Sequence, residues 1–119
     1  MLLQIISYAY TLSRLFLKSA LELALTALLD PGSILLLPPP GFSLYQVIAE
    51  SHGASVAFYR LLPDQDWECD LEHLEELLLE HGDRVRGILV NNPSNPTGSV
   101  FGNDHLQDLV RFCDRHRLP

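Results

Sequence analysis

The sequence has little basic charge and almost no lysine. It holds 119 residues with 8 basic and 15 acidic side chains, a formal net charge of −7, and Lys18 is its only lysine. Nucleic acids and anionic membranes are bound through clustered Lys and Arg, so this balance argues against both as the main partner. Chemistry that requires a lysine amine is limited to Lys18 within these residues.

Cysteine is also scarce. Cys69 and Cys113 form neither a disulfide framework nor a CxxC motif, and two reduced, partly buried thiols are typical of a cytoplasmic protein. The spacing of the histidines matches no metal-ligand pattern, so we expect surface or boundary positions and no metal site. The histidines are His52, His73, His81, His105 and His116.

No hydrophobic run is long enough to span a bilayer. Residues 1–13 carry no charge, but they fall short of the roughly 20 residues that a spanning helix needs. They also lack the positive segment that begins a secretory signal. Arg14, Lys18 and Glu22 recur every four positions, which predicts an amphipathic helix over residues 11–29 and no membrane role.

Helical and extended patterns alternate along the rest of the chain. They predict strands at 33–37, 55–61 and 86–90, and helices at 42–52, after an Asp70 cap and after an Asn103 cap. The apolar stripes of the last two helices are Leu71, Leu74, Leu77 and Leu78, and Leu106, Leu109, Val110 and Cys113. Strands that alternate with helices imply an α/β fold with three layers, α-β-α, around a mostly parallel sheet.

Two loops leave the carboxyl ends of predicted strands, where ligands of such sheets bind. One covers residues 38–45. The other covers residues 91–98, Asn-Asn-Pro-Ser-Asn-Pro-Thr-Gly, and is called the asparagine loop below. Its two prolines restrict the backbone, so holding an uncharged amide toward a ligand oxygen costs little entropy, and Gly98 allows a positive φ. On these residues alone, a rigid connection without a ligand is an equal alternative.

The run Asn-Pro-Ser-Asn-Pro-Thr-Gly at 92–98 resembles the signature of the class I and II aminotransferases, fold type I enzymes that depend on pyridoxal phosphate (PLP). Other segments resemble tyrosine aminotransferases in order and spacing: Pro40-Gly41-Phe42-Ser43-Leu44-Tyr45, Leu61-Leu62-Pro63, Trp67-Glu68 and Ser99-Val100-Phe101. The resemblance implies that residues 20–119 are part of the large, PLP-binding domain. Residues 1–19 are expected to be a helical segment outside the family pattern.

The resemblance assigns two cofactor contacts. It implies that the Asn95 amide donates to the phenolic oxygen of PLP, and that the Phe42 ring stacks on the pyridine ring. Core packing is the alternative role for Phe42. The family reaction moves the amino group of an aromatic amino acid to 2-oxoglutarate, in homodimers whose active sites lie near the subunit interface.

The sequence also departs from the family pattern. Residues 15–18, Leu-Phe-Leu-Lys, stand where the family has a small-residue loop that binds the phosphate, and Pro39 stands where it usually has arginine. The family's Schiff-base lysine follows the signature, whereas Lys18 precedes it. The aspartate that pairs with the pyridine nitrogen and the arginine that binds the substrate carboxylate also have no counterpart here. We therefore expect no catalytic residue within this chain and no turnover by the chain alone.

Three functions remain open. The first is a partial tyrosine aminotransferase-like polypeptide, and the second is another fold type I activity, an alanine-type aminotransferase or a lyase. The third is a non-catalytic remnant that pairs with a full-length subunit. For the origin of the chain, the sequence favours the first function, a partial tyrosine aminotransferase-like polypeptide. It favours the third for the action of this polypeptide itself, because a partial domain leaves sheet edges and apolar helix faces uncovered.

Overall fold

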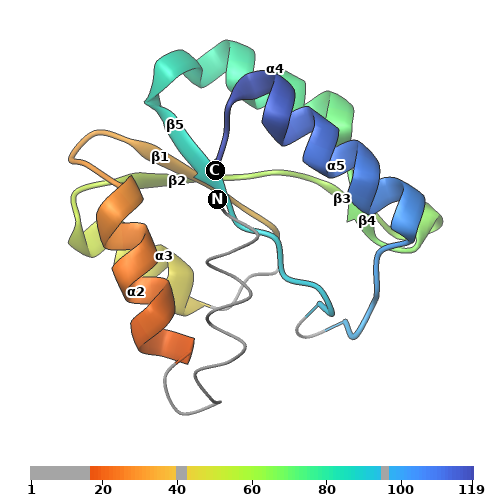
Figure 1. The fold of residues 1–119 in the computed structure, drawn as a ribbon, viewed down its shortest axis with the longest axis horizontal. Helices are drawn as coiled ribbons and strands as arrows, with labels where there is room; N and C mark the ends of the chain where they lie inside the picture. Colours follow the sequence, from red (N-terminus) through yellow and green to blue (C-terminus); the bar gives the residue numbers. More distant parts are fainter. Residues whose placement is uncertain (1–16, 40–42, 95–96) are drawn as a thin grey trace.

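The computed structural model of the chain describes residues 17–39, 43–94 and 97–119. Its centre is a parallel sheet of β1 (Ile34–Leu37), β2 (Ser55–Phe58) and β5 (Val85–Ile88), in the order β2-β1-β5. Ile34 of β1 pairs with Ser55 of β2 on one side and with Val85 of β5 on the other. The first of the described strands, β1, is therefore the central strand of the sheet (Figure 1).

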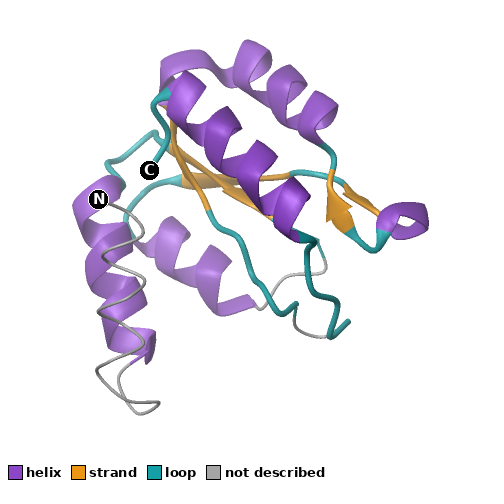
Figure 2. Ribbon diagram, turned by 45° about the vertical axis from the view of Figure 1, so that its right-hand side comes forward, coloured by secondary structure: helices purple, strands orange, loops and turns teal. Residues whose placement is uncertain are grey.

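Helices cover both faces of this sheet (Figure 1, Figure 2). On one face lie α2 (Leu17–Leu28) and α3 (Ser43–Ser51). On the other lie α4 (Leu71–His81) and α5 (Asn103–His116). The predicted three-layer α/β fold with parallel strands is confirmed.

The residues of β1 explain why there are two helical layers. All four are apolar and buried. Successive side chains of a strand point to opposite faces of the sheet. Leu35 and Leu37 accordingly join the hydrophobic cluster under α2 and α3, whereas Ile34 and Leu36 join the cluster under α4 and α5.

The predicted strand over residues 55–61 is split into two elements, so that prediction was wrong. β2 ends at Phe58, and β3 (Leu61–Leu62) pairs antiparallel with β4 (Glu68–Cys69) around the short 3-10 helix η1 (Pro63–Gln65). The reason lies in β1, which is followed in the sequence by three prolines, residues 38–40, and proline has no N–H group. β2 consequently loses its partner strand just beyond Tyr59, whose N–H donates to the Leu37 carbonyl at 3.0 Å.

The ends of the last two helices give one confirmed and one wrong prediction. Asp70 caps α4, because its Oδ1 accepts from the N–H of His73 at 3.0 Å. Asn103, the other predicted cap, is instead the first residue of α5, and the extended residue Gly102 holds the cap position. The apolar stripe of α5 is also shifted: Phe112 is 2% exposed, whereas Val110 is 45% exposed.

The remaining predicted elements are present with small shifts. Strand 86–90 is found as Val85–Ile88 and helix 42–52 as Ser43–Ser51. Helix 11–29 is found as Leu17–Leu28, and its predicted first six positions lie outside the described residues. Within the described part of the chain, every helix is too short or too polar to cross a membrane.

Candidate functional site

The carboxyl ends of the three parallel strands lie at one edge of the sheet, called the carboxyl edge below. The segment 38–45 follows β1, Tyr59 and Arg60 follow β2, and the asparagine loop follows β5. The described residues of both predicted site loops therefore leave the sheet at the same edge. The two residues with predicted cofactor contacts, Asn95 and Phe42, lie outside the described residues, and their contacts stay predictions.

The described part of the asparagine loop closes on itself. The N–H of Gly98 donates to the Ser94 carbonyl at 2.8 Å, and the N–H of Ser94 donates to the Ser99 carbonyl at 2.9 Å. The hydroxyls of Thr97 and Ser99 lie 2.9 Å apart. Gly98 has a φ of 72°, so the predicted positive φ is confirmed. These bonds join the described residues on the two sides of positions 95 and 96.

Asn92 joins the beginning of this loop to the segment that follows it. Its Oδ1 accepts from the N–H of Phe101 at 3.0 Å, and the Phe101 side chain is buried among the residues under α4 and α5. This role of Asn92 was not predicted, because its partner lies nine positions away and no local pattern points to it. The loop thus returns to the core at a fixed place.

Tyr59 holds the other end of the same loop. Its hydroxyl donates to the carbonyl of Leu89, the residue that follows β5, at 2.9 Å. Burial, and after it the neighbouring Cys69 thiol, raises the pKa of the Tyr59 hydroxyl far above its usual range. The hydroxyl therefore keeps its proton and acts as a donor at any physiological pH.

His105 ties α5 to the β3–β4 hairpin. Its Nε2 accepts from the N–H of Cys69 at 3.0 Å, which leaves the proton of the neutral ring on Nδ1, 3.5 Å from Glu68 Oε2. The Phe101 ring packs edge-on against the imidazole, with 5.2 Å between ring centres. All five histidines have intermediate exposure, as boundary residues do. In the described part of the chain, no cluster of three or more His, Cys, Asp or Glu side chains is arranged to hold a metal ion.

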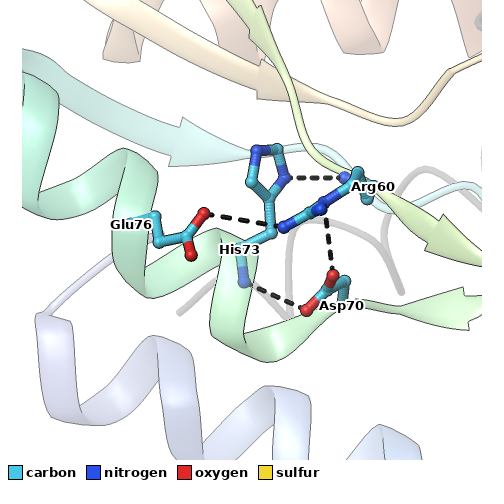
Figure 3. A network of polar contacts seen from close by, with 4 residues as sticks. All are labelled: Arg60, Asp70, His73 and Glu76. Carbon is cyan, nitrogen blue, oxygen red and sulfur yellow. Dashed lines mark hydrogen bonds and ion pairs between the residues drawn. The ribbon is translucent and has the colours of Figure 1, made fainter.

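Arg60, a cation at the carboxyl edge, is already paired with carboxylates (Figure 3). Its Nε lies 3.3 Å from Asp70 Oδ2 and its Nη2 lies 3.5 Å from Glu76 Oε2. Its backbone N–H donates to His73 Nδ1 at 3.0 Å. Such exposed pairs contribute little to stability, but they direct the guanidinium toward the first turns of α4.

Among the hollows of the described surface, two shallow ones lie along α5. One is lined by Leu106, Gln107 and Val110 with their neighbours, and the other lies between α4 and α5 around Phe112 and Arg115. Residues of the asparagine loop line neither hollow. The candidate site is therefore defined by the position of the asparagine loop at the carboxyl edge and not by either hollow.

Comparison with known proteins gives a consistent result. Residues 17–119 match the family described as aminotransferase class I and II. The chain is 48% identical to the tyrosine aminotransferase of Mus musculus over 102 residues, which cover 86% of this chain and 22% of that protein. It spans about a fifth of the length of the curated tyrosine aminotransferases from mouse, cattle and human that it matches, 22% in each case.

Solved structures agree with the sequence comparison. The crystal structure of a tyrosine aminotransferase from Leishmania infantum superposes with a TM-score of 0.80 at 35% identity, covering 86% of this chain and 27% of that chain. An alanine aminotransferase from Pyrococcus furiosus superposes with a TM-score of 0.78 at 30% identity, covering 87% and 25%. The predicted partial aminotransferase fold and the resemblance to tyrosine aminotransferases are both confirmed.

Proposed function

The chain belongs to the class I and II aminotransferase family, and from this membership we propose that it contributes the loop side of a PLP site in a tyrosine aminotransferase-like enzyme. The proposed reaction transfers the amino group of an aromatic amino acid to 2-oxoglutarate. The observation that carries the proposal is the position of the asparagine loop. The loop begins at the carboxyl edge and is held there by hydrogen bonds at Leu89 and Asn92. The strong match to tyrosine aminotransferases supports an aromatic substrate over alanine.

The family uses PLP, and the donor groups of the described loop fit the ring side of that molecule. Asn91 and Ser94 carry neutral amide and hydroxyl groups on the loop that follows β5, and such groups suit a phenolic oxygen better than a metal ion. When bound, PLP supplies an electron sink for the reaction at the amino acid's α-carbon. We assign the chain an orienting part: Asn95 donates an N–H to the phenolic oxygen, and the Phe42 ring excludes water from one face of the cofactor ring.

The 119-residue polypeptide by itself is proposed to be inactive. Its single lysine, Lys18, precedes the asparagine loop, and the lysine that the family resemblance requires follows it. Arg60 is held by Asp70 and Glu76, so we assign it no contact with the phosphate. We thus expect this polypeptide to bind PLP without catalysing amino transfer.

An experiment on the purified chain tests both parts. We expect Asn95→Ala to weaken PLP binding by about five- to tenfold, the effect of one lost hydrogen bond. Asn103→Ala, which changes an exposed asparagine on α5, is the matched control. With tyrosine and 2-oxoglutarate added, glutamate measured by mass spectrometry should stay at background. Equal affinity of the two variants would contradict the site, and turnover that Lys18→Arg abolishes would contradict the inactivity.

Association with a full-length subunit is the second candidate function. It is favoured by large apolar side chains exposed on the outer helices, among them Leu23 on α2 at 72% and Val47 on α3 at 59%. Co-expression with a full-length tyrosine aminotransferase should give a complex that co-purifies, and Leu23→Glu with Val47→Glu should weaken it. Absence of a complex would remove this candidate.

Three narrower predictions accompany the proposal. The family match begins at residue 17, the first residue of α2, and a domain boundary between residues 19 and 20 stays a prediction. A cytoplasmic location and a homodimer of the complete enzyme also stay predictions.

A further inference from the structure

The side chain of Tyr59 connects two strands that are not neighbours. Tyr59 directly follows β2, and its hydroxyl reaches the Leu89 carbonyl that directly follows β5. Because β1 lies between β2 and β5, this side chain crosses the carboxyl end of β1. Tyr59 is 0% exposed and belongs to the hydrophobic cluster under α4 and α5. A buried hydroxyl in such a position is normally present for its hydrogen bond.

The sheet itself lacks a partner for the Leu89 carbonyl. The N–H of Leu89 donates to the Leu36 carbonyl at 2.9 Å, which continues the parallel β1–β5 ladder. In a parallel ladder the carbonyl of the same residue would accept from the N–H two positions further along β1, at position 38. That residue is Pro38, which has no N–H. The Tyr59 hydroxyl stands in for the donor that the proline removes.

This hydrogen bond sets the direction in which the chain leaves the sheet. The Leu89 carbonyl and the next N–H belong to one planar peptide unit, so fixing the carbonyl fixes the unit. Asn91 follows two residues later, and the Asn92 Oδ1 accepts from the N–H of Phe101, three residues beyond the end of the loop. The loop is thus held at both ends by side-chain bonds to backbone.

We infer that Tyr59 is a positioning residue for the asparagine loop, its hydroxyl replacing the missing N–H of Pro38 and aligning the loop toward the 3-hydroxyl of a pyridine ligand. The inference rests on the proposed function, because the loop's ligand is the one proposed above. Tyr59 does not touch the ligand. We therefore expect Tyr59 to affect the preference for ligands that carry the 3-hydroxyl and not the binding of the phosphate group.

Two probes that cannot form an imine with Lys18 test this role: pyridoxine 5′-phosphate and its analogue without the 3-hydroxyl. Their Kd values are measured for the whole chain and for Tyr59→Phe, which removes only the hydroxyl. We expect the wild-type chain to prefer the hydroxylated probe and Tyr59→Phe to reduce that preference by about three- to fivefold. The apparent pKa of the bound probe's 3-hydroxyl, followed by absorbance, should rise toward its value in water.

Ser33→Ala is the matched control. The Ser33 hydroxyl is also buried and also donates to a backbone carbonyl, that of Asp30 at 2.6 Å, but it lies at the opposite end of β1. Loss of this bond should leave the preference between the probes unchanged. An unchanged preference in Tyr59→Phe would overturn the inference and leave the proposed function standing. A wild-type chain without any preference would overturn both.

A measurement on the wild-type chain covers the case in which Tyr59→Phe does not fold. Among the tyrosine hydroxyl protons, that of Tyr59 should exchange slowly with solvent and show scalar coupling to the Leu89 carbonyl carbon in NMR spectra. A fast-exchanging Tyr59 hydroxyl would overturn the inference without any variant.

Discussion

Two residues beneath the carboxyl edge hold protons more firmly in the folded chain than in the unfolded one. Burial, the largest cause, raises the pKa of the Cys69 thiol from 9.0 to about 12, and it raises the pKa of the Tyr59 hydroxyl above its ordinary 10.0. Both groups lie in the cluster under α4 and α5. The neutral forms are thus part of the packing, and an unfolded chain would release both protons at the ordinary values.

This difference predicts a loss of stability at alkaline pH. Below pH 9 the Cys69 thiol is protonated in both states, so its contribution is fully present. Between pH 9 and about 12 the unfolded state binds fewer protons, and the free energy of unfolding falls as the pH rises. Each such group adds a slope of about 1.4 kcal/mol per pH unit.

Urea unfolding between pH 8 and pH 11 measures that slope. Cys69→Ala should make it shallower by about the contribution of one group, whatever the variant does to stability at neutral pH. Tyr59→Phe should show a similar change at higher pH, because its ordinary value is 10.0. An equal slope in Cys69→Ala and wild type would show that the thiol titrates alike in both states.

At the scale of the elements, the sequence predicted those whose signals are local. The four apolar residues of β1 indicate a buried strand by themselves, and they are all buried. Asp70 with the leucines of α4 gives a cap and a stripe within one helix. The place of the asparagine loop followed from topology, since parallel strands bring their carboxyl ends to one edge.

The elements and contacts that the sequence did not predict depend on distant partners. The hydrogen bond from Tyr59 to Leu89 joins residues 30 positions apart, and the one from Cys69 to His105 joins residues 36 positions apart. The break after β2 depends on prolines that follow another strand, so the composition of residues 55–61 alone indicated one longer strand. The loop that carries the candidate site has a local sequence pattern, whereas the side chains that hold it are brought together only by the three-dimensional fold.

At the scale of the whole molecule, β1 makes the two helical layers depend on each other. Its side chains alternate between the cluster under α2 and α3 and the cluster under α4 and α5. Removing a side chain on one face leaves a cavity against the strand that both clusters share. The described part of the chain should therefore unfold as one unit, although its two clusters share no side chain.

Leu35→Ala tests this coupling, because it acts on one layer and can be observed from the other. Leu35 is 2% exposed under α2 and α3, whereas Trp67, the only tryptophan, lies in the turn between β3 and β4 beside the other layer. We expect a loss of about 2–5 kcal/mol in the free energy of unfolding, with equal midpoints from Trp67 fluorescence and far-UV circular dichroism. Leu79→Ala, at a leucine 85% exposed on α4, should change stability by less than about 0.5 kcal/mol. If Leu35→Ala lowered the circular dichroism midpoint and left the Trp67 midpoint in place, the layers would be separate folding units, and alignment of the asparagine loop through Tyr59 would not depend on α2 and α3.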